Sequence, residues 1–114
     1  MALTEARRTG EFLISEANGT ISREEVTVAA AASALVAGTV MGKITASGKY
    51  VAYSNGAADG SEAAAGILYA AVADSAADQK AVLIVRHAEV AENRLTGIDA
   101  NGKADLLALG VIVR

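Results

Sequence analysis

The sequence contains no cysteine, no proline and no tryptophan, and its aromatic residues are one phenylalanine and three tyrosines. Without cysteine the chain has no disulfides, no thiolate chemistry and none of the common zinc sites. The ten lysines and arginines form no basic cluster, and no aromatic residues are spaced to stack on bases. These absences argue against a direct contact with nucleic acid.

Long apolar runs are also missing. No apolar stretch approaches the roughly 18 residues that a membrane-spanning helix needs. The first segment, "MALTEARRTGEF", lacks the apolar centre of a signal peptide. We therefore expect a protein that is made in the cytoplasm and has no membrane partner.

Alanine is what the sequence has in excess. Hydrophobic residues make up 53% of the 114 positions, and 27 of them are alanine. A chain of this length forms one domain. Because alanine buries little area, the core of a single copy should be shallow. This composition favours an oligomer in which a subunit interface completes the burial.

Short apolar segments separated by polar or glycine-bearing turns predict a mainly β fold. One helix is expected within 99–110, with a start signal at Asp99 and Asn101, an apolar stripe of three leucines and a stop at Gly110. The alanine-rich segment 29–38 is ambiguous and also permits a helix. A small β barrel or β clip with one short C-terminal helix accounts for this pattern. The expected strands are 11–14, 25–28, 39–45, 49–53, 66–72, 81–85 and 111–113. The apolar stripe comprises Leu106, Leu107 and Leu109.

The runs "GILYAAV" (66–72) and "AVLIV" (81–85) carry no charge and do not alternate between polar and apolar residues. Strands of this kind are buried on both faces. We expect the protein itself to cover one face of 66–72, and more of the same chain or a neighbouring subunit to cover the other. Gly66, Ile67, Leu68 and Tyr69 are the predicted subunit contact.

Candidate sites for chemistry are weak. His87 is the only histidine, and no G-x-S-x-G nucleophile motif accompanies it, so we interpret it as a solvent-facing residue at a strand end. The segment 99–105 has the acidic spacing of a calcium loop but places Lys103 where an oxygen ligand is required. Asp59, Ser61 and Glu62 fit a solvated loop better than a cation site. We predict no enzyme activity, no metal and no cofactor.

The order of several segments resembles the head decoration protein family of tailed bacteriophages, the group typified by protein D of phage lambda. The resemblance rests on "GEFLISEANGTISREEVTV", "AGTVMGKIT", "GKYVAYSNGAADGSEAAAGILYAAV", "AVLIVRHAEV" and "LGVIVR". It runs from about Thr4 to Arg114. It implies a β-clip domain that forms a trimer on the outer surface of an expanded head at three-fold sites. There it would stabilise the shell against the pressure of DNA.

The resemblance also implies a division of the chain. Residues 1–14 would be a flexible arm that orders against the major capsid protein, and 15–114 would be the decoration domain. "EFLI" would add a strand to a capsid sheet. The protein would reside in the virion, after a period in the host cytoplasm during assembly. The implied arm contacts are Thr4, Arg7, Arg8, Glu11, Phe12, Leu13 and Ile14.

Two other classes of function stay open from the residues alone. A small β-barrel module that binds a sugar or a peptide would need exposed aromatic residues, and Tyr50 and Tyr53 are the candidates. Their opposite parity on one strand counts against this alternative, because it points them to opposite faces. An enzyme would need a polar, partly buried cluster around His87.

Overall fold

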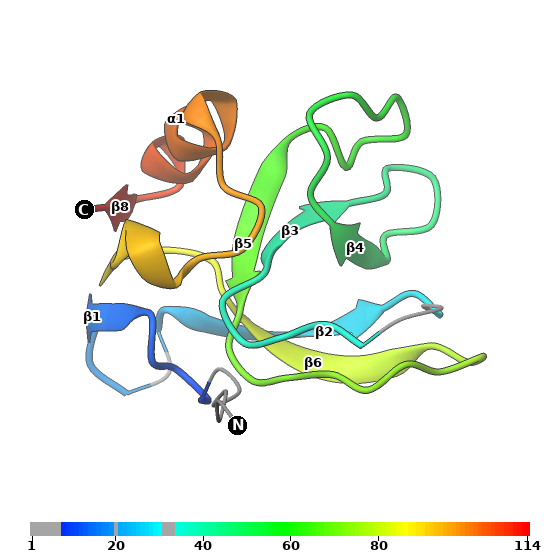
Figure 1. Cartoon of the computed structure of the whole chain (residues 1–114), viewed down its shortest axis with the longest axis horizontal. Helices are drawn as coiled ribbons and strands as arrows, with labels where there is room; N and C mark the ends of the chain where they lie inside the picture. The colour runs from blue at the N-terminus through cyan, green and yellow to red at the C-terminus, as the bar shows by residue number, and fades with distance from the viewer. Residues whose placement is uncertain (1–7, 20, 31–33) are drawn as a thin grey trace, which may run out of the picture.

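The computed structural model describes residues 8–19, 21–30 and 34–114. These residues form eight strands, one α-helix and one short 3-10 helix (Figure 1). The prediction of a mainly β fold with one short C-terminal helix is confirmed. The elements are β1 (Leu13–Glu16), β2 (Arg23–Val28), β3 (Val40–Lys43), β4 (Tyr50–Ala52), β5 (Ala64–Leu68), β6 (Gln79–Ile84), β7 (Ala88–Val90), η1 (Glu92–Arg94), α1 (Ala100–Ala108) and β8 (Val111–Val113).

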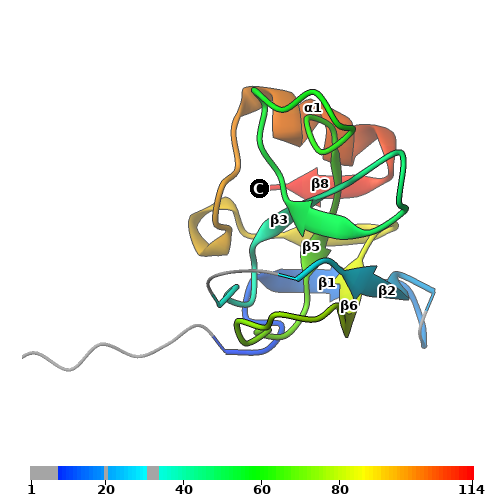
Figure 2. The same ribbon diagram turned by 90° about the vertical axis from the view of Figure 1, so that its right-hand side faces the viewer.

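The strands form two sheets. A closed barrel has the strand order β2-β4-β3-β5-β6, and a three-stranded sheet has the order β1-β7-β8. Most of the barrel pairs are antiparallel, and β2 pairs with β4 in parallel. In Figure 1, β1 and β8 lie on the left and the barrel occupies the centre and right. Figure 2 gives the view at right angles, and in both views α1 lies above β8.

Buried side chains gather in two cores. The first fills the barrel and receives inward side chains from each of its five strands. The second lies between the barrel, the three-stranded sheet and α1. The barrel core comprises Val26, Val28, Met41, Tyr50, Leu68, Val72, Leu83 and Val85. The second core comprises Phe12, Val40, Tyr53, Ala64, Ile67, Ile84, Ala88, Val90, Leu95, Leu106 and Val111.

Strands β5 and β6 contribute to both cores, which confirms the prediction that the two uncharged runs are buried on both faces. Leu68 and Leu83 point into the barrel, whereas Ile67 and Ile84 point into the second core. All four are 0% exposed. The same chain covers both faces, so these strands need no neighbouring subunit for their burial. The strand predicted over 66–72 lies earlier in the chain, since β5 ends at Leu68.

The C-terminal helix begins and ends at its predicted signals. The Asp99 side chain accepts a hydrogen bond from the Gly102 N–H at 2.7 Å, which caps the first turn. Gly110 follows the helix with φ +87°, a conformation that glycine adopts readily. The predicted leucine stripe is wrong in part. Leu106 is fully buried but Leu107 is 62% exposed, because successive helical residues point about 100° apart.

The alanine-rich segment before β3 is not helical where the structure describes it. Leu35 forms an isolated antiparallel bridge with Val72, and a turn follows at Ala37 and Gly38. The bridge closes one end of the barrel over Val72, which belongs to the barrel core. Residues 31–33 lie outside the described residues.

The double burial of β5 predicts a large cost for truncating its side chains. Ile67→Ala should lower the free energy of unfolding by about 2–5 kcal/mol, because it leaves a cavity in the second core. The matched control is Ile112→Ala on β8, whose side chain is 42% exposed, and it should cost less than about 1 kcal/mol. Urea unfolding of both variants measures the difference. Equal losses would show that Ile67 is not in a sealed core.

Candidate binding surface

The structure places the described part of the expected arm on the body of the protein. Phe12 is 0% exposed and belongs to the second core. Its carbonyl accepts a hydrogen bond from the Ala91 N–H at 2.7 Å, and Leu13 in β1 pairs with Val90 in β7. Phe12 and Leu13 are therefore docked on the body, whereas the resemblance implied a flexible arm over 1–14. The physical reason is that the chain's only phenylalanine fills its own core.

The other predicted arm residues are spread around this docked segment. Arg8 and Ile14 are exposed, and Glu11 is half-buried. The Glu11 carboxylate lies 3.7 Å from the Arg94 guanidinium on η1. Thr4 and Arg7 lie outside the described residues. Arg8 is thus the first described residue of the segment that precedes the docked part.

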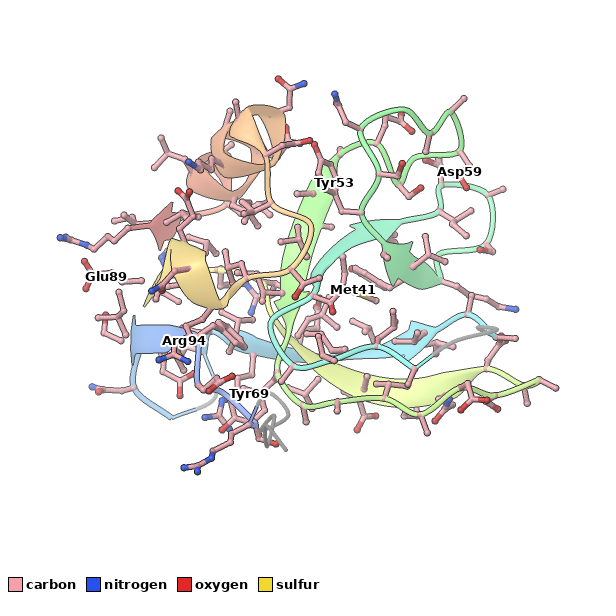
Figure 3. All side chains as sticks on the ribbon, viewed as in Figure 1. Met41, Tyr53, Asp59, Tyr69, Glu89 and Arg94 are labelled. Atoms are coloured by element: carbon pink, nitrogen blue, oxygen red, sulfur yellow. The ribbon has the colours of Figure 1, made fainter. Side chains whose placement is uncertain are left out.

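The point at which this segment meets the body is built around Tyr69, which is labelled in Figure 3. The Gly10 N–H donates to the Tyr69 carbonyl at 2.9 Å. The Arg23 guanidinium lies over the Tyr69 ring, 4.2 Å from its centroid. Two hydrogen bonds, of 2.7 and 3.1 Å, join Arg23 to the Glu16 carboxylate. Gly10, Tyr69, Arg23 and Glu16 are called the arm root from here on.

The predicted subunit contact stays a prediction, since one chain alone does not test it. Gly66 is buried, and Ile67 and Leu68 are fully enclosed by the cores of a single chain. These three residues leave little side-chain surface for another copy. Of the four predicted residues, Tyr69 alone is half-buried, and it serves the arm root.

Large apolar side chains remain exposed elsewhere on the surface. They lie on β1, on the turn before β2, in the loop before β3, at the end of α1 and on β8. An open groove of about 570 Å³ runs beside Leu109, with alanines and Tyr50 among its lining residues. The exposed apolar residues are Ile14, Ile21, Val36, Leu107, Leu109 and Ile112.

The two tyrosines proposed for a ligand-binding module point into different cores. Tyr50 belongs to the barrel core and Tyr53 to the second core. Both are 8% exposed. The two tyrosines therefore point to opposite faces, as their positions in the sequence predicted, and they do not lie side by side in one groove. This arrangement removes the aromatic platform that the sugar- or peptide-binding alternative required.

The single histidine lies on the turn between β6 and β7. His87 is exposed and has φ +51°. The buried Ser22 hydroxyl donates to the His87 carbonyl at 2.9 Å and accepts from the Ala17 N–H. Ser22 thus fixes the backbone of this turn, so the polar contacts around His87 have a structural role.

The acidic residues that suggested cation sites also make structural contacts. The Asp105 carboxylate accepts from the Ala64 N–H at 3.0 Å, which joins α1 to β5. The Asp59 carboxylate accepts from the Ser61 hydroxyl and N–H, and these hydrogen bonds lower the pKa of Asp59. No group of three or more metal-ligating side chains occurs within 8–19, 21–30 and 34–114. Among these same residues, no helix is long and apolar enough to cross a membrane.

Tyr53 and Asp99 form a hydrogen-bonded pair of titrating groups, and the pKa of each is shifted. The Tyr53 hydroxyl donates to the Asp99 carboxylate at 2.8 Å. Burial, with this hydrogen bond and the nearby negative charge, raises the pKa of Tyr53 to about 12. The hydrogen bonds from Gly102 and Tyr53 lower the pKa of Asp99. The pair connects the end of β4 to the start of α1 and contributes to stability.

Taken together, the geometry of the described residues defines a small two-core β protein in which Asp59, Asp99 and Asp105 make structural contacts. A comparison with models of known protein families identifies the family to which this β protein belongs. The family model of the bacteriophage lambda head decoration protein D matches residues 2–111. The chain belongs to this family, and membership implies that it binds the phage capsid and resides in the virion. A search of curated proteins found no match.

The Tyr53–Asp99 pair predicts a specific alkaline transition. Because the pKa of Tyr53 is raised in the folded chain, its contribution to stability is complete below the ordinary pKa of 10.0 and is lost as the pH rises toward about 12. Asp99→Asn should bring the pKa of Tyr53 back toward 10, since it removes the negative charge but keeps a helix cap. Absorbance titration of tyrosinate measures this change. An unchanged titration curve in the variant would contradict the assignment.

Proposed function

We propose that this chain forms a homotrimer that binds the outer surface of an expanded phage head at its three-fold sites and stabilises the shell. The observation that carries the proposal is the family match over residues 2–111. The described residues leave surface for such contacts, because large apolar side chains such as Leu107 and Ile112 stay exposed although both cores are complete. The chain would be made in the host cytoplasm and join the head after expansion.

The contact with the major capsid protein would come from residues that precede Gly10, among them Thr4, Arg7 and Arg8. Phe12 and Leu13 already occupy the chain's own core and sheet. Their use by the shell would require the free chain to unfold locally, so we move the proposed contact upstream of them. An extended segment can add to a sheet edge through main-chain hydrogen bonds and needs few special side chains.

Three such segments on one trimer would act together. Once one segment is bound, the other two are held near their sites at a high effective concentration. The trimer can then bind tightly although each contact is weak. Because it would bind the expanded shell and not the unexpanded one, its binding free energy stabilises the expanded state. Closed contacts around a three-fold axis are one of the common symmetric arrangements of homo-oligomers.

The proposed arm is tested by two truncations that differ in whether they keep Phe12. A variant that lacks residues 2–8 keeps Phe12 and should stay folded, but it should lose binding to expanded heads that lack the decoration protein. A variant that lacks residues 2–14 should also lose stability, because it empties the site of Phe12 in the second core. Co-sedimentation with heads and thermal melting measure the two effects. Full binding by the shorter truncation would disprove the arm contact.

The proposed oligomer is tested by mass in solution. Light scattering at micromolar concentration should give three times the chain mass of 11.5 kDa. Replacing Leu107 by Glu, on the exposed side of α1, is a first probe of the subunit contact and leaves both cores intact. A monomeric mass for the unaltered chain would contradict the trimer.

A further inference from the structure

We propose that Tyr69 is a positioning residue for capsid binding: together with Gly10 and Arg23, it fixes the point at which the N-terminal segment leaves the body. The inference rests on the proposed function of that segment, and the experiment below separates the two. It also gives a role to a large aromatic side chain that is only half-buried. Its ring also packs against the edge of the second core, so the proposed role adds to a structural one.

Gly10 is the first element of the arm root. Its N–H donates to the Tyr69 carbonyl, and its φ of +66° lies in the left-handed region. A Cβ atom at this position would lie 2.9 Å from Cε1 of Tyr69. Only glycine can therefore bring the backbone this close to the ring without displacing it.

Arg23 and Glu16 are the second element. The guanidinium lies 4.2 Å from the centroid of the Tyr69 ring, within the range of a cation–π contact. The paired hydrogen bonds to Glu16 fix the plane of the guanidinium. The Tyr69 ring cannot move aside freely, because it lies between the backbone of Gly10 and the guanidinium of Arg23.

The third element is the chain that follows Gly10. The Leu13 N–H donates to the Gly10 carbonyl at 3.0 Å, which makes a tight turn. Phe12 within this turn is fully buried in the second core. The segment is thus held at both Gly10 and Phe12, and its direction at residue 9 is set before any partner is present. A preset direction lowers the cost of binding, because less freedom is lost on association.

Limited trypsin digestion of the full chain tests the arm root directly. Cleavage after Arg8 requires the residues around that bond, including Gly10, to leave the body. Tyr69→Leu should raise the rate of this cleavage roughly tenfold, because it removes the ring contacts. Tyr69→Phe keeps the ring and should cleave at the rate of the unaltered chain. Mass spectrometry identifies the cleaved bond.

A glycine pair provides the matched control. Gly10→Ala and Gly19→Ala impose the same backbone strain, since their φ values are +66° and +64°. A Cβ atom at Gly19 meets nothing within 4 Å, whereas one at Gly10 meets the Tyr69 ring. Gly10→Ala should therefore raise cleavage after Arg8, and Gly19→Ala should not. In a Tyr69→Leu background the effect of Gly10→Ala should largely disappear, because the two residues act on one contact.

Binding to expanded heads that lack the decoration protein completes the test. Tyr69→Leu should weaken binding roughly tenfold. Tyr69→Phe keeps the packing of the ring on the second core and should bind like the unaltered chain. Equal cleavage rates in the unaltered chain, Tyr69→Leu and Gly10→Ala would overturn the arm root. Faster cleavage with unchanged head binding would overturn the positioning role. Full head binding by the chain that lacks residues 2–8 would instead overturn the proposed arm contact, whatever the cleavage rates.

Discussion

The whole structure depends on the burial of β5 and β6 on both faces. Strand β5 offers no polar face to water, because Ile67 and Leu68 lie on opposite faces and both are enclosed. Leu83 and Ile84 repeat this arrangement at the end of β6. A closed barrel covers one face only. The second layer, made of the three-stranded sheet, α1 and Phe12, covers the other. The helix cap at Asp99 and its contact with Tyr53 hold this layer against the barrel.

The local elements of this fold are predictable from sequence, but the partner of the second face is not. Uncharged runs reveal double burial, and Asp99 with Gly110 marks the ends of α1. The pattern of apolar residues along a strand shows that both faces are buried. It does not show whether another subunit or the same chain supplies the side chains that cover the second face. The low content of large side chains favoured another subunit. One phenylalanine from a polar N-terminal segment, together with Leu106 and the strands β7 and β8, proves sufficient.

The candidate binding surface was less predictable than the fold. Thr4, Arg7 and Arg8 have no pattern of their own, and their proposed role derives from the family. Gly10 within a polar segment indicates a turn, but nothing in the sequence indicates that Tyr69, almost sixty positions later, lies against it. The contact between Arg23 and Tyr69 also joins residues far apart in the sequence. Such contacts depend on the closure of the barrel, which brings β2 beside β6 and the end of β5 beside the N-terminal segment.

Completion of both cores within one chain has a thermodynamic consequence for a decoration protein. Because both cores close within one chain, the free energy of the proposed head binding would not be spent on folding the domain and would stabilise the shell by linkage. The closed barrel also leaves no long sheet edge that would promote aggregation before assembly. The remaining edges belong to β1 and β8, which are four and three residues long. On the sheet they flank, Glu89 forms an ion pair with Arg114 and accepts a hydrogen bond from Ser15. A body whose two cores close within one chain would therefore leave its surface and the residues before Gly10 for the proposed subunit and capsid contacts.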